Sequence, residues 1–143
     1  MGSFTGLIYS SGTITASGNS GWLDLESILG IGTAGGTSRI AIDRATLRIV
    51  PSGLSTDETL AVEMNLAWDS AGAGDVKIHD FTSITNTNGQ ETVILPGDDS
   101  EALLVVATEL VQAPLPAFWK FTHTLAGTTK SMAYSIYAAL TWS

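Results

Sequence analysis

Strict alternation of apolar and polar residues is the feature that most constrains how this chain can fold. In the segment TLAVEMNLAW every second residue is a large apolar one, and these are Leu60, Val62, Met64, Leu66 and Trp68. Successive side chains of a β-strand point to opposite faces of the sheet, so this period predicts a strand with one buried face. We expect all five residues to face the core.

The last quarter of the chain carries the same period twice. AFWKFTHTL and SMAYSIYAALTW both alternate, and the turn sequence AGTT joins them. In the second segment Tyr134, Ile136 and Leu140 lie on the apolar side, whereas Tyr137 lies on the other. The two segments therefore predict a hairpin of long strands.

The segment RIAIDRATLRIV (39–50) also alternates, but its phase slips midway. Its first two isoleucines share one parity, and the apolar residues after Arg44 share the other. One extra residue in a β-bulge near Asp43-Arg44 restores a single buried face.

Shorter strand candidates, separated by turn sequences rich in Gly, Pro, Asn and Asp, fill the rest of the chain. They are 7–15, 76–84, 91–95 and 102–110, and a short helix is expected over 23–30. About eight strands at this spacing predict an all-β protein, an antiparallel β-sandwich that is jelly-roll-like. We expect one domain over residues 1–143, with an N-terminal arm of about residues 1–15.

The charge of the chain argues against two classes of partner. Charged residues make up only 14% of the sequence, and the net charge is −8. An acidic surface repels phosphates, so no nucleic-acid partner is expected, nor attraction to an anionic membrane. No run of apolar residues is long enough to predict a membrane span. Because ordinary proteins are ~25% charged, the low value indicates either a surface that a partner covers or a Ser/Thr/Gly-rich surface that is polar but uncharged.

Residues suited to catalysis or metal binding are few. His79 and His123 each lie inside a predicted strand, so we expect them to be packed or hydrogen-bonded structural residues. The acidic pairs of DSAGAGD and GDDSE do not follow the calcium-loop pattern, and Asp and Gly are ordinary turn formers. We therefore predict no catalytic activity, no metal and no cofactor.

The tryptophans leave two interpretations open. Trp22, Trp68, Trp119 and Trp142 are spread over the chain. Exposed together on a β-sandwich, they form a platform on which sugars stack, as in a carbohydrate-binding module. Packed in the core or at a subunit interface, they are structural, and the alternation around Trp68 and Trp142 favours this.

From Leu60 onward the order of features resembles a known group of proteins. A strand ends before a Gly-rich turn (AVEMNLAWDSAGAG), VKIHDFTSIT and NGQETVIL follow, and a Pro-introduced aromatic strand (LPAFWKFTHTL) leads through GTTKS to a last alternating strand. This sequence resembles small all-β structural proteins encoded in the head-gene clusters of tailed bacteriophages. TASGNSGWLDL resembles their N-terminal segment, and Gly127 to Ser131 is the most specific part.

The resemblance implies a decoration, or cement, protein that carries no catalysis. Its expected partner is the major capsid protein, and its expected location is the outer surface of the capsid in the virion. The low charge favours a homo-oligomer. On a capsid the expected form is a trimer, because neighbouring capsomers meet at three-fold positions, and a dimer is the alternative. Glycine-rich and terminal segments that order on a neighbour are expected to supply the contacts: Gly2, Phe4, Leu7, Tyr9, Gly32, Gly35 and Thr37. The alternative hypotheses are a tail or fibre component and a carbohydrate-binding module.

Overall fold

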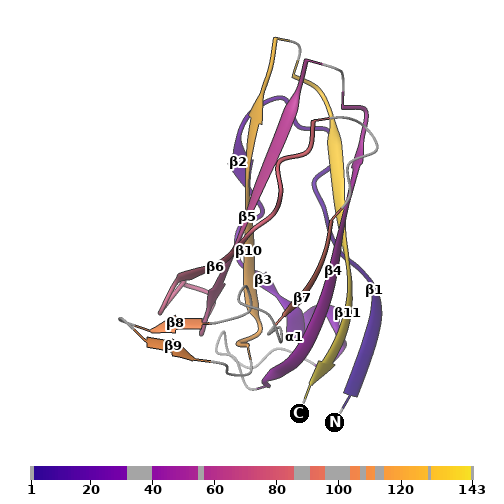
Figure 1. Cartoon of the computed structure of the whole chain (residues 1–143). Helices are drawn as coiled ribbons and strands as arrows, with labels where there is room; N and C mark the ends of the chain where they lie inside the picture. The colour runs from indigo at the N-terminus through magenta and orange to yellow at the C-terminus, as the bar shows by residue number, and fades with distance from the viewer. Residues whose placement is uncertain are drawn as a thin grey trace.

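Two antiparallel sheets face one another in the computed structural model (Figure 1). The structure describes residues 2–31, 40–54, 57–85, 91–95, 104–106, 109–111, 115–128 and 130–142. Sheet I has the order β1 (Gly2–Ser10), β11 (Ala133–Trp142), β4 (Ile42–Ser52) and β7 (Glu91–Leu95). Sheet II has the order β2 (Gly18–Asn19), β10 (Phe118–Ala126), β5 (Thr59–Ala67) and β6 (Val76–Asp80), and β3 (Leu23–Asp24) also pairs with β10. A separate hairpin contains β8 (Leu104–Val106) and β9 (Glu109–Val111).

The pairing of strands is nested, first with last. β1 pairs with β11, β2 and β3 pair with β10, β4 pairs with β7, and β5 pairs with β6. The pairs β11–β4 and β10–β5 then complete the two sheets. A long double strand rolled up in this way is the jelly-roll form of the β-sandwich. The predicted fold class is confirmed, with β2 and β3 sharing one strand position and β8–β9 added as a separate hairpin.

The core lies between the sheets, where the alternating residues meet. Leu60, Val62, Met64 and Leu66 of β5 are all buried, and Trp119 and Phe121 of the neighbouring β10 are fully buried. From sheet I, Tyr134, Ile136 and Leu140 face the same layer and are buried as predicted. Complete burial of an aliphatic or aromatic side chain of this size contributes roughly 1.5–3 kcal/mol.

The predicted β-bulge in β4 is confirmed. Thr141 pairs with Arg44, whereas the next residue, Trp142, pairs with Ile42, so Asp43 is the extra residue. The bulge turns Ile42 into the core together with Ala45, and both are fully buried.

The prediction for Trp68 is wrong. β5 ends at Ala67, and Trp68 is 53% exposed. The chain leaves the sheet here, because the Trp68 N–H donates to the carbonyl oxygen of Ala73 at 2.9 Å and begins a turn. The alternation of β5 therefore does not extend to this residue.

The N-terminal segment, expected to be an arm, lies along the sandwich. Residues 2–10 form β1, which pairs with β11 from Gly2 opposite Trp142 to Ser10 opposite Ser135. Further along, Ile14 makes a bridge with Met132. Residues 2–14 are thus held along sheet I, and β1 is the edge strand of that sheet. Both termini lie at the same end of the sandwich (Figure 1).

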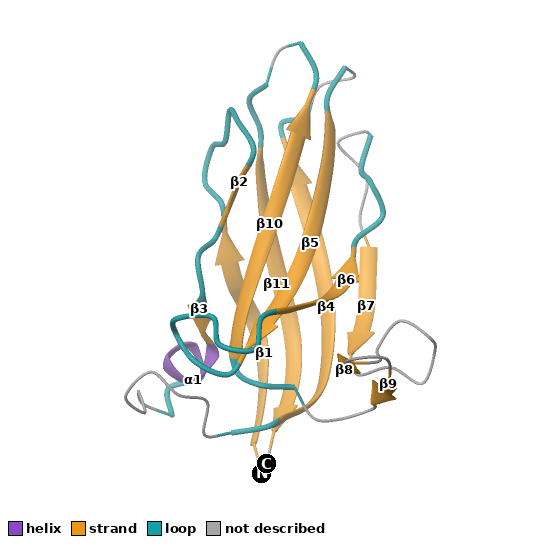
Figure 2. Cartoon of the chain, turned by 90° about the vertical axis from the view of Figure 1, so that its left-hand side faces the viewer, coloured by secondary structure: helices purple, strands orange, loops and turns teal. Residues whose placement is uncertain are grey.

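The short predicted helix is present as α1 (Leu25–Ile28). Asp24 caps it, since its carboxylate accepts from the N–H groups of Glu26 and Ser27 at 3.0 and 3.4 Å. Figure 2 shows α1 beside the lower end of β10, next to β3. No helix in the described part of the chain is long and apolar enough to cross a membrane.

Candidate functional site

The outer face of sheet I is the candidate site. It consists of the residues that alternate with core positions along the sheet: Ser3, Thr5, Leu7, Arg44, Thr46, Arg48, Val50, Thr92, Ser135, Tyr137, Ala139 and Thr141. The bulge at Asp43 and the strand register hold these side chains on one surface.

One row of this face carries large exposed side chains. Leu7 lies opposite Tyr137, Tyr137 opposite Arg48, and Arg48 opposite Thr92. Leu7 is 46% exposed and Tyr137 is 45% exposed. Cross-strand neighbours of this kind contact one another, so the two apolar groups form one patch.

A shallow hollow of about 310 Å³ lies beside this row. Its lining includes Thr5, Gly6, Thr46, Arg48, Tyr137 and Ala139. Thr5, Ala139 and Thr46 form the neighbouring row of the sheet, with Thr5 opposite Ala139 and Ala139 opposite Thr46. Because these side chains are short and those of Tyr137 and Arg48 are long, the surface is recessed between them.

The charge of this face differs from that of the whole chain. The protein has a net charge of −8, yet the alternating positions of the outer face of sheet I include two arginines and no Asp or Glu, and the exposed bulge residue Asp43 lies next to Arg44. Tyr and Arg are enriched at protein interfaces, whereas Asp, Glu and Lys are depleted there. Tyr137, Arg44 and Arg48 are therefore of the types typical of a contact surface, whereas the serines and Ala139 of the face are of types depleted there.

The structure places the contact residues expected from the sequence in different parts of the molecule. Leu7 is on the outer face of sheet I. Phe4 and Tyr9 pack against the core instead, and the Tyr9 ring stacks on Phe121 with centroids 6.2 Å apart. Gly2 lies against the Trp142 indole. The other three, Gly32, Gly35 and Thr37, lie outside the described residues.

Sequence reasoning missed the partners of Leu7 on this face. Tyr137 and Arg48 come from strands far away in the sequence, and only the pairing of β1, β11 and β4 brings them together. The sequence does contain one indication of this face, because Tyr137 is a large aromatic residue on the polar side of a strongly alternating strand.

His123 has the structural role that was predicted for it. It is buried between the sheets, with Nδ1 2.9 Å from the Tyr134 hydroxyl and Nε2 3.2 Å from the Ala16 carbonyl oxygen. Burial lowers the pKa of His123, and the Ala16 carbonyl partly opposes this. Burial also raises the pKa of Tyr134, with a further contribution from Tyr9. Both side chains are therefore neutral near pH 7.

His79 is buried as well, as expected of a packed residue. Its ring lies edge-on to Phe81, with centroids 4.9 Å apart, and its Nε2 is 3.8 Å from a carboxylate oxygen of Glu91. His79 and His123 lie on β6 and β10, with β5 between these strands.

The acidic turn residues serve the loops that contain them. Asp69 accepts from the N–H groups of Ala71 and Ala73, and Asp75 accepts from Asn65. Asp98 and Asp99 lie outside the described residues. Within the described ranges, no three His, Cys, Asp or Glu residues are grouped so that they could hold a metal ion.

Comparison with known proteins gives similar structures but no family. No family model and no curated protein matches the chain. A chain of the infectious bursal disease virus Gt strain structure is 12% identical with a TM-score of 0.42, and one of the Gx strain is 11% identical with a TM-score of 0.46. In both, 96% of this chain matches 32% of the other.

A third similar structure is that of T=1 particles derived from infectious bursal virus. It is 14% identical with a TM-score of 0.37, and 96% of this chain matches 28% of that chain. This protein thus spans about a third of the length of the chains that it matches. The similar structures are of a virus or of particles derived from it. TM-scores below 0.5 at this identity assign no function, so the function is inferred from the residues of the protein itself.

Proposed function

We propose that the protein is a non-enzymatic structural component of a virion, which decorates and cements the outer surface of a tailed-phage capsid shell. Its partners are the major capsid protein and further copies of itself in a homotrimer. The outer face of sheet I is the observation that carries this proposal. The resemblance of GTTKS and the strands around it to phage head proteins points to the same function.

The exposed row supports the proposal through its composition. Leu7 and Tyr137 leave nearly half of their surface in water, although a stable sandwich has a core in which to bury such groups. Interface energy concentrates in a few aromatic and arginine side chains that a partner desolvates. Tyr137 and Arg48 are neighbours of this kind, and the hollow beside them accepts a protruding side chain.

The rigidity of the face supports a cementing role. Its residues are on paired strands, so little conformational entropy is lost when a partner binds. The arginines Arg44 and Arg48 match a shell surface that carries carboxylates. A trimer presents three copies of the face, and multivalent attachment then holds firmly through contacts that are individually modest.

The test compares one substitution on the two faces of the sandwich. Thr5→Glu places a carboxylate at the hollow of sheet I, whereas Thr124→Glu adds the same group to an exposed position on the outer face of sheet II. Virus-like particles from cells that express the protein with its neighbouring genes are banded on a density gradient. The amount of the protein on the particles is then measured.

We expect the wild-type protein and Thr124→Glu to band with the particles. Thr5→Glu and Tyr137→Ser should lose occupancy by about tenfold or more while remaining folded by circular dichroism. Full occupancy of both face variants contradicts the proposal. A wild-type protein that sediments as a monomer contradicts the trimer, and antibody labelling on a tail instead of the shell favours the tail-component alternative.

A further inference from the structure

A second exposed feature lies on the other sheet, around the loop that joins β5 to β6. This loop, residues 68–75, is called the Trp68 loop here. Trp68 is the most exposed large apolar side chain of the described residues, at 53%. Trp22, which is half-buried, contacts the same loop through Gly72.

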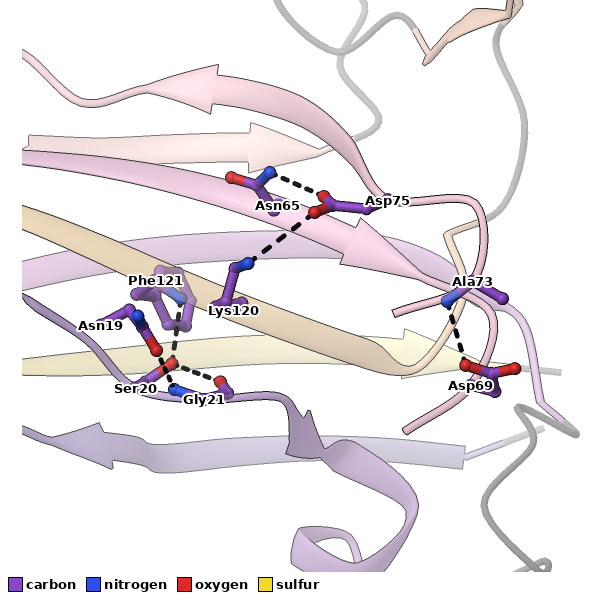
Figure 3. Close-up of polar contacts among 9 residues, drawn as sticks. All are labelled: Asn19, Ser20, Gly21, Asn65, Asp69, Ala73, Asp75, Lys120 and Phe121. Atoms are coloured by element: carbon purple, nitrogen blue, oxygen red, sulfur yellow. Dashed lines mark hydrogen bonds and ion pairs between the residues drawn. The ribbon is translucent and has the colours of Figure 1, made fainter. Parts of the chain in front are cut away.

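The Trp68 loop is fixed by its own hydrogen bonds (Figure 3). The Asp69 carboxylate accepts from the N–H groups of Ala71 and Ala73 at 2.9 and 3.0 Å. The main chain closes the turn further, since the Asp75 N–H donates to the Gly72 carbonyl oxygen at 3.1 Å. The loop that carries Trp68 therefore has a defined, hydrogen-bonded conformation.

Two glycines let the loop backbone lie directly against the two indole rings. A Cβ added at Gly74 lies 2.8 Å from Cδ1 of Trp68, and one added at Gly72 lies 2.8 Å from Nε1 of Trp22. Any larger residue at either position forces the ring away. The backbone thus supports both tryptophans from one side and leaves Trp68 open on the other.

Hydrogen-bonding groups lie at the end of the loop and beside the Trp22 ring. The Asn65 amide donates to Asp75 Oδ1 at 2.7 Å, and Lys120 Nζ is 3.7 Å from Asp75 Oδ2 (Figure 3). The same ammonium lies 4.6 Å from the centroid of the Trp22 ring. An ammonium has three donors and each carboxylate oxygen has two lone pairs, so these groups can also bind hydroxyl groups of a ligand.

We propose that the Trp68 loop is a binding site for neutral carbohydrate. The apolar C–H face of a pyranose ring stacks on Trp68, because an aromatic face is electron-rich and attracts such C–H groups. Asp75, Asn65 and Lys120 bind the hydroxyl groups at the edge of the sugar. An aromatic wall with a few fixed polar groups is the usual composition of a small-molecule site.

The charges of the site favour a neutral sugar over other flat ligands. Asp69 and Asp75 flank the loop on a chain of net charge −8, and both disfavour the phosphates of a nucleotide. The site belongs to the β5–β6 end of sheet II, on the opposite sheet from the proposed capsid contact. Both surfaces can therefore be occupied together, and the site stands even if the capsid proposal fails.

The experiment uses the whole protein and a fixed set of neutral glycans. Retardation is measured in native gels that contain amylopectin, β-glucan, xylan, galactomannan or dextran. Maltohexaose, cellohexaose, xylohexaose, mannohexaose and chitohexaose are titrated by isothermal calorimetry, because the Trp68→Ala variant lacks the tryptophan whose fluorescence would report binding. The variants are Trp68→Ala, Trp68→Tyr and Asp75→Asn, and Tyr137→Ala is the control for an exposed aromatic residue on the other sheet.

At least one glycan should bind the wild type and the Tyr137→Ala control equally. Trp68→Ala should weaken binding about tenfold or more, Trp68→Tyr should retain part of it, and Asp75→Asn should weaken it while the ring remains. Each variant is first shown to unfold at the wild-type temperature. The proposal is overturned if no glycan binds, or if Trp68→Ala binds as the wild type does. It is also overturned if Trp68→Ala abolishes self-association or particle binding without any glycan effect, since a protein then covers the loop.

Discussion

The buried hydrogen bond between Tyr134 and His123 should contribute measurably to the free energy of unfolding. The Ala16 carbonyl oxygen faces Nε2 of His123 and only accepts, so Nε2 carries the proton. Nδ1 is then an acceptor, and the Tyr134 hydroxyl, 2.9 Å away, donates to it. Both residues are at most 5% exposed, so water does not replace a missing partner easily.

Tyr134→Phe removes this donor and keeps the ring. The substitution loses a hydrogen bond worth about 0.5–1.5 kcal/mol and leaves Nδ1 as a buried acceptor, which costs about 1–3 kcal/mol. The two costs describe partly the same loss and therefore do not add in full. We expect the free energy of unfolding to fall by roughly 2 kcal/mol in total. His123→Leu should also destabilise, and the double variant should lose less than the sum by roughly 1 kcal/mol, because the two residues are coupled.

The assay is urea unfolding near pH 7.5, followed by tryptophan fluorescence, to which the fully buried Trp119 contributes. All four proteins of the cycle should unfold with the same dependence on urea, so that midpoints compare directly. A loss below about 0.5 kcal/mol for Tyr134→Phe, or strictly additive effects in the double variant, refutes the assignment of donor and acceptor.

The same pair gives a pH dependence with a definite sign. Burial lowers the pKa of His123 in the folded protein, whereas an unfolded histidine titrates near about 6.5. The unfolded chain therefore binds the proton more readily. The stabilising effect of a neutral His123 is complete above that pH and is lost progressively as the pH falls below it, toward the lowered folded pKa. His123→Leu should show a smaller loss of stability between about pH 7.5 and 5.5 than the wild type, and equal losses contradict this.

Three further predictions follow from packing, turn geometry and the acidic loops. Leu66→Ala, at a fully buried position of β5, should lower the free energy of unfolding by roughly 2–5 kcal/mol in urea titrations, and a loss under about 1 kcal/mol argues against its place in the core. Gly127→Ala should cost more than Gly12→Ala in the same titrations. Both glycines have positive φ, at 135° and 62°. A Cβ at Gly127 lies 2.5 Å from the Asp57 carbonyl oxygen, whereas a Cβ at Gly12 meets nothing within 4 Å. Equal losses of stability in the two variants therefore refute this turn geometry. EDTA should leave the melting temperature unchanged, because Asp69 and Asp75 already bind N–H groups of the loop and of Asn65, and a drop of several degrees restores the calcium hypothesis.

The strands were predictable because their signal is local. Alternation along β5 and β11 placed Leu66 and Ile136 in the core, and the phase slip of β4 located the bulge at Asp43. In each case the information lies within a few residues, since side chains of a strand change face at every step. Trp68 shows the limit of this signal, because a loop hydrogen bond ends the strand one residue before it.

The site was less predictable because it depends on long-range pairing. Leu7 was expected to make contacts, but as part of an arm, and nothing near it in the sequence indicates that it pairs with Tyr137. The nested order of the strands brings together residues from both ends of the chain, and this order is a property of the whole fold. The exposed face could therefore be recognised only after β1, β11 and β4 were placed side by side.

The bulge at Asp43 links the core of the protein to its proposed contact surface. Ile42 and Arg44 have the same parity in the sequence, so a regular strand places both on one side of sheet I. With Asp43 as the extra residue, Ile42 turns inward and is fully buried, while Arg44 remains on the outer face in line with Arg48. The extra residue thus places Ile42 in the core and leaves Arg44 and Arg48 on the surface. The outer face on which the cementing proposal rests, with both arginines exposed, is in this way a direct consequence of the strand register.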